Sequence, residues 1–226
     1  MSIDNHRLIC VTALVAAAWA FPAAAEDVCA PDKMLKVVTV ADTPHLDPAS
    51  FAAKPRTLYR QGERYGRVEE PLNPRTGTQL VFVVNEPDVW VADLVSKRGE
   101  HALDPGPTYV FRAQIFGEAA SNNAVIRGIE FGCEARAMRA AGAKETKVDH
   151  ETFGRVTQLE HTEASEKIVM LLDGKSKPKR LELYYEDKLA FAMNYAEYND
   201  TLPFDPTLFQ KPAGIEYQDA HGSGNR

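Results

Sequence analysis

The segment RLELYYEDKLAFAMNYAEY, residues 180–198, predicts a β-hairpin and with it the class of the fold. Two runs of alternating side chains, residues 180–185 and 188–198, flank Glu186-Asp187, a pair that favours a tight turn. Successive side chains of a strand point to opposite faces of a sheet. In the second run one face is bulky and the other small: Leu189, Phe191, Met193 and Tyr195 against Ala190, Ala192 and Asn194.

Runs with the same two-residue period fill most of the chain from Arg56 onward. The expected strands cover residues 57–60, 65–70, 79–84, 88–95, 101–103, 144–150, 154–161 and 167–172, with a further extended piece at 109–116. Short turns such as Asp173-Gly174 separate them, and Asp104-Pro105-Gly106-Pro107 forms a loop. Because parallel strands would need long crossovers, short connections predict an antiparallel meander.

One segment, residues 122–142, departs from this pattern. Apolar side chains recur there at every fourth position: Val125, Ile129, Cys133 and Ala137. This spacing predicts a helix, with its centre at residues 129–141 and Gly142 at its end.

Several strands are apolar on both faces, most clearly residues 79–84 and 88–95. A sheet with one face in water would carry polar side chains at every second position. Both faces are therefore expected to be covered, in one of two ways. The sheet either encloses a filled sandwich or barrel core, or it curves so that its concave face holds helices over an apolar cavity.

The first 25 residues are typical of a secretory signal peptide. His6 and Arg7 precede an apolar run from Leu8 to Phe21, and Ala23-Ala24-Ala25 offers a cleavage site. A membrane-spanning helix needs about 20 apolar residues, and this run is shorter. We therefore expect an exported protein that has no transmembrane anchor after cleavage.

The rest of the 226-residue chain suits one domain, residues 26–217, with a flexible tail at 218–226. The domain is expected to begin irregularly, over residues 26–55, with a short helix at 49–53. The net charge of −6 gives no basic surface for nucleic acid, so a nucleic-acid partner is not expected.

Cleavage would remove Cys10 and leave two cysteines, Cys29 and Cys133. An even number in an oxidising compartment favours a disulfide between them, which would fasten the N-terminal segment to the helix. The alternative is a pair of buried free thiols.

No catalytic or metal-binding motif stands out. His150 and His161 have glutamate neighbours but match no known metal-ligand spacing, and no serine lies in a Gly-x-Ser-x-Gly elbow. We therefore expect no enzymatic activity, no metal and no cofactor. A secreted enzyme whose site is assembled from distant strands is the least favoured of three hypotheses.

The order of elements resembles the LolA-like fold of periplasmic lipoprotein carriers and their lipid-binding relatives. The similar stretches are Arg67-Val68-Glu69-Glu70 with Val89-Trp90-Val91, and the closing residues 181–214, which run from the last hairpin through Asn199-Asp200 and Phe204-Asp205-Pro206 to Pro212-Ala213-Gly214. The resemblance implies an α+β fold: a large curved antiparallel sheet, a half-barrel-like meander, with a few helices packed on its concave face.

It also implies the first functional hypothesis: a non-catalytic binding protein of the Gram-negative periplasm that holds an apolar or acyl ligand, a lipid or lipoprotein-type cargo. The expected lining residues are bulky positions on one face of their strands: Phe82, Trp90, Leu94, Phe111, Phe191, Met193 and Tyr195. The second hypothesis is a structural module with a filled core and an envelope protein partner.

Overall fold

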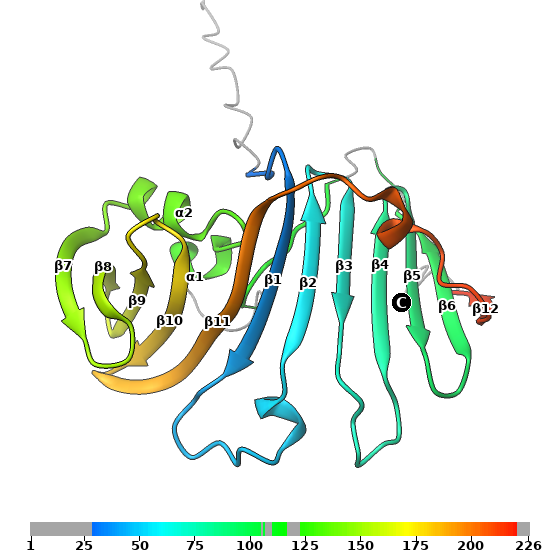
Figure 1. Cartoon of the computed structure of the whole chain (residues 1–226), viewed down its shortest axis with the longest axis horizontal. Coiled ribbons are helices and arrows are strands. Elements are labelled where there is room, and N and C mark those ends of the chain that lie inside the picture. The colour runs from blue at the N-terminus through cyan, green and yellow to red at the C-terminus, as the bar shows by residue number, and fades with distance from the viewer. Residues whose placement is uncertain (1–28, 105, 107–109, 117–122, 221–226) are drawn as a thin grey trace, which may run out of the picture.

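In the computed structural model, residues 29–104, 106, 110–116 and 123–220 are described, and they form a 12-stranded sheet with two short α-helices (Figure 1). The strands are β1 (Met34–Ala41), β2 (Arg56–Gln61), β3 (Tyr65–Glu69), β4 (Leu80–Asn85), β5 (Asp88–Asp93), β6 (Arg98–Leu103), β7 (Lys144–His150), β8 (Gly154–Glu163), β9 (Glu166–Leu172), β10 (Pro178–Tyr185), β11 (Lys188–Leu202) and β12 (Glu216–Asp219). The helices are α1 (Ala124–Gly128) and α2 (Glu134–Ala140), with 3₁₀ turns at Phe51–Ala53 and Pro206–Phe209.

The sheet is open, and its strands lie in the order β12-β6-β5-β4-β3-β2-β1-β11-β10-β9-β8-β7. Two antiparallel meanders, β2–β6 and β7–β11, confirm the strands expected over residues 57–103 and 144–198. The described part of the extended piece expected at 109–116 forms no strand and pairs through an isolated bridge at Gln114, while residue 109 lies outside the described residues. The hairpin predicted over residues 180–198 is confirmed as β10 and β11, with Arg180 opposite Asn194 and Leu183 opposite Phe191.

The two ends of the domain differ from the prediction. Residues 26–55 are not irregular throughout, because β1 lies within them and joins the meanders by pairing with β2 and β11. The predicted tail is wrong for Gln218 and Asp219, which belong to β12 and pair parallel with β6. Residues 1–28, which include the predicted signal peptide, and residues 221–226 lie outside the described part of the chain.

The prediction of one continuous helix over residues 129–141 is wrong. Ile129 has extended backbone angles and ends α1, and Gly132 takes φ +90°, a left-handed value that glycine tolerates best. Between them Glu130 pairs with Gln114 in an isolated β-bridge. Two short helices therefore flank an extended piece that is tied to residues 111–116.

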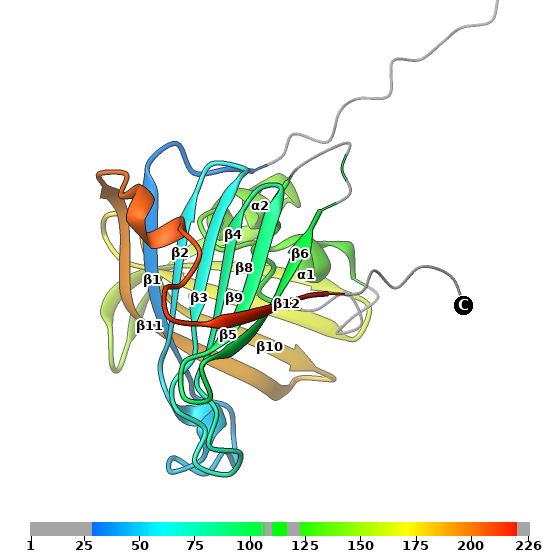
Figure 2. The same cartoon turned by 90° about the vertical axis from the view of Figure 1, so that its right-hand side faces the viewer.

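The sheet bends, so that β7–β10 turn across β2–β6 with α1 and α2 in the angle between them (Figure 2). We call the face toward the helices the inner face and the opposite one the outer face. The main core fills much of the inner face, where Ile126, Ile129 and Met138 pack over residues of β1, β8, β9 and β10. Every residue of the main core is less than a tenth exposed.

The outer face is covered in two places. Val81, Val83, Trp90 and Ala92 of β4 and β5 pack beneath Ile215 and Tyr217 of the C-terminal segment, and Val156, Val169 and Leu171 form a smaller cluster with Phe153 and Tyr184. The expectation that both faces are covered is confirmed only in part, because the inner-face residues Phe82 and Val91 of β4 and β5 are half-buried and belong to no core cluster.

Cys29 and Cys133 form a disulfide, as predicted, with their Cα atoms 6.0 Å apart. The fully buried Arg60 lies nearby and donates hydrogen bonds to the carbonyl oxygens of Cys29 (2.8 Å), Phe131 (3.0 Å) and Phe111 (3.3 Å). The disulfide and Arg60 together fasten the N-terminal segment and the helical region to β2. We call residues 111–116 and 123–141 the cover.

Candidate ligand-binding cavity

A cavity of about 350 Å³ lies between the cover and the inner face of the sheet. This volume falls at the lower end of the range of small-molecule sites, about 300–1,000 Å³. Its lining comes from β1, β2, β3, β11 and the cover: Thr39, Ala41, Arg56, Thr57, Leu58, Val68, Phe111, Arg112, Ala113, Gln114, Ile115, Phe131, Phe191 and Met193. Most of these side chains are apolar.

The floor of the cavity follows from strand register. Leu58 of β2 lies opposite Val37 of β1 on one side and Val68 of β3 on the other, so these apolar side chains share the inner face. Two residues before Leu58, Arg56 pairs with Thr39. The apolar floor therefore gives way to a polar end within one strand.

The roof is the cover, and backbone hydrogen bonds hold it in place. Ile115 N donates to Ile129 O (3.0 Å) and Phe131 N donates to Ala113 O (2.9 Å), which pairs the two extended pieces of the cover. Phe111 N donates to Glu63 O (2.7 Å) and ties the roof to the β2–β3 turn.

Phe111 reaches the floor because β3 has a glycine beneath it. A Cβ atom added at Gly66 would lie 2.3 Å from Cε1 of Phe111, far inside van der Waals contact. A glycine within a strand is typical of such a close approach. Gly66 therefore sets the height of the roof at this point.

A buried charge cluster lies beside the cavity. Arg60 pairs with Glu130 at 2.9 Å, and Arg112, whose side chain is 44% exposed, pairs with the other oxygen of Glu130. Burial lowers the pKa of the Arg60 guanidinium from its ordinary value, and Glu130 opposes that shift. One carboxylate thus serves two guanidinium groups.

The structure brings three of the seven predicted lining residues to the cavity. Phe111, Phe191 and Met193 line it, and Phe116 of the cover packs edge-on against Phe191 with 5.4 Å between ring centroids. Tyr195, 5% exposed, belongs to the main core behind Phe131.

The other three predicted residues lie away from the cavity. Phe82 shares the inner face, paired with Val68, but does not line the cavity. Trp90 and Leu94 lie in the outer-face cluster, where Trp90 stacks on His101 at 5.6 Å between centroids. Alternation alone cannot tell which face of a strand meets the cover.

Sequence reasoning missed the arginines and the floor residues. Arg56, Leu58 and Arg60 alternate along one strand, and their common period would have placed two charges and one apolar side chain on one face. No local pattern distinguishes Arg112, whose position depends on the long-range pairing of the cover.

A second buried acid lies behind the cavity rather than in it. Glu134 of α2 is 1% exposed and accepts hydrogen bonds from Gly132 N (2.9 Å), Tyr195 OH (3.3 Å) and Tyr198 OH (3.4 Å). Burial raises its pKa to about 7, although these hydrogen bonds act in the opposite direction. Through these hydrogen bonds Glu134 ties α2 to Tyr195 and Tyr198 of β11.

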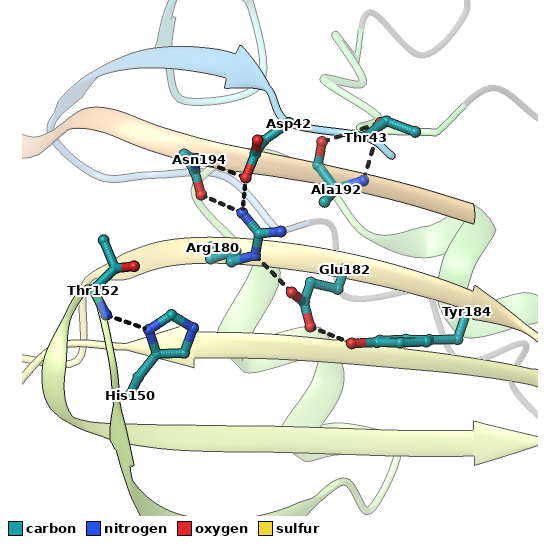
Figure 3. A network of polar contacts seen from close by, with 9 residues as sticks. All are labelled: Asp42, Thr43, His150, Thr152, Arg180, Glu182, Tyr184, Ala192 and Asn194. Carbon is teal, nitrogen blue, oxygen red and sulfur yellow. Dashed lines mark hydrogen bonds and ion pairs between the residues drawn. The ribbon is translucent and has the colours of Figure 1, made fainter. Parts of the chain in front are cut away.

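A polar pocket of about 290 Å³ lies on the outer face, over β10 and β11 (Figure 3). Arg180 donates to Asp42, to Glu182 (2.6 Å) and to Asn194 (2.8 Å). Tyr184 OH donates to Glu182 (2.8 Å), and burial followed by this carboxylate raises the pKa of Tyr184 to about 12. These groups are hydrogen-bonded to one another. Their main effect is to hold β10, β11 and Asp42, which follows β1, together.

Of the two histidines considered as metal ligands, His150 has a hydrogen-bond partner, whereas the buried Nε2 of His161 has none within hydrogen-bond distance among the described residues. His150 Nδ1 accepts a hydrogen bond from Thr152 N (3.1 Å), and His161 Nε2 lies 3.9 Å from Glu163 (Figure 3 shows His150). Within the described ranges, no group of three or more histidine, cysteine, aspartate or glutamate side chains could hold a metal ion. No helix in that part of the chain is long and apolar enough to cross a membrane.

Comparison with known proteins identifies no family. No family model matches the chain, and no curated protein matches it. Among solved structures it is similar to the crystal structure of an uncharacterized conserved protein from Thermus thermophilus. The two share 12% sequence identity over 84% of this chain and 91% of the other, with a TM-score of 0.46.

Proposed function

We propose that this protein is an exported, non-catalytic binding protein that holds an apolar or acyl ligand, such as a lipid or lipoprotein-type cargo, beneath its cover. The observation that carries the proposal is the apolar cavity between the cover and the inner face. The LolA-like order of elements noted in the sequence leads to the same ligand class. The Cys29–Cys133 disulfide is compatible with an oxidising compartment such as the periplasm.

The competing function is an envelope module with a filled core. The inner face is indeed filled beneath α1 and α2, where Ile126 and Met138 are fully buried. Beneath residues 111–115 it is hollow, and the hollow is lined by Leu58, Val68 and Phe191. A purely structural module has no need of this space, since native cores are close-packed.

Filling the cavity tests the proposal. Ala41 lines the cavity from β1, so Ala41→Phe would place a ring in the space that a ligand needs. Ala140→Phe makes the same change at the exposed end of α2, away from the lining, and serves as the matched control. Thr39→Phe is a second filling variant, from the middle of β1.

We expect the wild type and Ala140→Phe to bind a fluorescent ten-carbon fatty acid with equal affinity. Ala41→Phe and Thr39→Phe should weaken binding at least tenfold, with thermal unfolding checked by circular dichroism for every variant. No binding to the wild type, or equal binding to all four proteins, would reject the proposal.

A further inference from the structure

The charged side chains that line the cavity are both arginines. Arg56 enters from β2 and Arg112 from the cover, and the described lining contains no aspartate or glutamate. Thr39, which pairs with Arg56 on the same face, adds a hydroxyl group to this lining. The polar part of the cavity is therefore rich in hydrogen-bond donors and positive in charge.

Nearby carboxylates do not balance these charges. Arg112 shares Glu130 with the buried Arg60, so this carboxylate compensates only one of the two guanidinium groups. Arg56 has one carboxylate partner, Glu70, at 3.7 Å. Among the described residues, three guanidinium groups against two carboxylates leave an excess of one positive charge at the cavity.

Both arginines are partly exposed, although Arg56 already donates from Nη1 to the carbonyl oxygen of Ala52 (3.3 Å). The side chain of Arg56 is 32% exposed and that of Arg112 is 44% exposed, whereas Glu130 is 3% exposed. A guanidinium group has five N–H donors, and Arg112 contacts Glu130 through Nε. Its planar fork matches the paired oxygens of a carboxylate or phosphate.

The buried Glu134 does not alter this balance of charge in the cavity. Glu134 influences Arg60 electrostatically, but its carboxyl group is held by Tyr195 and Tyr198 on the far side of Phe131. It does not line the cavity.

We infer that the ligand is a single-chain amphiphile with an anionic head group, which Arg56 and Arg112 bind while the chain lies along Leu58, Val68 and Met193. This rests on the proposed function and specifies its ligand. The volume of about 350 Å³ is at the lower end of the range of small-molecule sites, about 300–1,000 Å³, which favours one chain over two. A free fatty acid and a single-chain phospholipid share this chemistry, with a carboxylate and a phosphate head respectively.

Four ten-carbon probes separate the contribution of the head from that of the chain: decanoate, decyl phosphate, decanol and decylamine. Each is measured by displacement of the fluorescent fatty acid. We expect decanoate or decyl phosphate to bind at least tenfold more tightly than decanol, and decylamine to bind most weakly. The tighter of the two anions identifies which source of the head group the cavity favours.

The double variant Arg56→Gln/Arg112→Gln should bring the anion and decanol affinities within twofold of each other while leaving decanol binding unchanged. Arg127→Gln/Arg136→Gln removes the same charge from exposed positions on α1 and α2 and should keep the tenfold preference. If the first variant unfolds, raising the salt from 0.05 to 1 M on the wild type provides the test. The preference for the anions over decanol should then decrease, because Arg56 and Arg112 are partly exposed and salt screens exposed charges.

The outcomes separate the two proposals. Equal binding of all four probes overturns the anionic-head inference and leaves the proposed function intact. An anion preference that survives in Arg56→Gln/Arg112→Gln overturns the assignment of these two arginines. Failure of every probe to bind overturns the proposed function and this inference with it.

Discussion

Replacing Glu134 with glutamine should stabilise the protein at neutral pH and leave it unchanged in acid. The carboxyl group is buried, which raises its pKa from 4.5 to about 7. One pKa unit corresponds to 1.36 kcal/mol, so holding this group ionised in the native state costs about 3 kcal/mol. Glutamine resembles the protonated acid in shape and has no charge to bury.

The sign of the pH dependence follows from proton binding. Between pH 4.5 and about 7 the native protein holds a proton on Glu134 that the unfolded chain has released. The contribution of Glu134 to stability therefore falls as pH rises through this window. Below pH 4.5 both states are protonated, and wild type and Glu134→Gln should have equal stability. Above pH 7 the difference should level off.

Urea unfolding at pH 4, 5, 6, 7 and 8 measures the difference in the free energy of unfolding. We expect the free energy of unfolding of Glu134→Gln to equal that of wild type at pH 4 and to exceed it by about 3 kcal/mol at pH 8. The exposed Glu151 lies in the β7–β8 turn, and Glu151→Gln should differ from wild type by no more than about 0.5 kcal/mol at each pH. A Glu134→Gln protein that is less stable than wild type by the same amount at every pH would refute this reasoning.

Two further predictions concern the cover. The Cys29→Ser/Cys133→Ser variant should lose about 2–5 kcal/mol of unfolding free energy, because the disulfide closes a loop of 104 residues; a loss below about 1 kcal/mol in urea unfolding would contradict this. Gly66→Ala should displace Phe111, destabilise the protein by about 1–3 kcal/mol and change the affinity for the fluorescent fatty acid. Gly174→Ala, where a Cβ atom meets nothing within 4 Å, is its control, and equal behaviour of the two alanine variants would exclude a contact role for Gly66.

The strands were predictable because their information is local. A two-residue period and a turn at Glu186-Asp187 are enough to specify the β10–β11 hairpin. The disulfide was predictable for another reason, since two cysteines outside the predicted signal peptide leave a single possible pairing. The helix prediction failed where tertiary pairing overrode periodicity, as Glu130 joined Gln114 in a bridge.

The amino-acid sequence alone was enough to predict an antiparallel sheet with strands that are apolar on both faces, and it favoured a disulfide between Cys29 and Cys133 that the structure then showed. Only the folded structure decided which face of each strand meets the cover and where the cavity lies. It places Trp90 on the outer face and Met193 at the cavity, although both looked alike as bulky alternating side chains. The two differ because alternation specifies two faces without saying what covers either. That depends on contacts between distant segments, such as Val37 of β1 beside Tyr198 of β11.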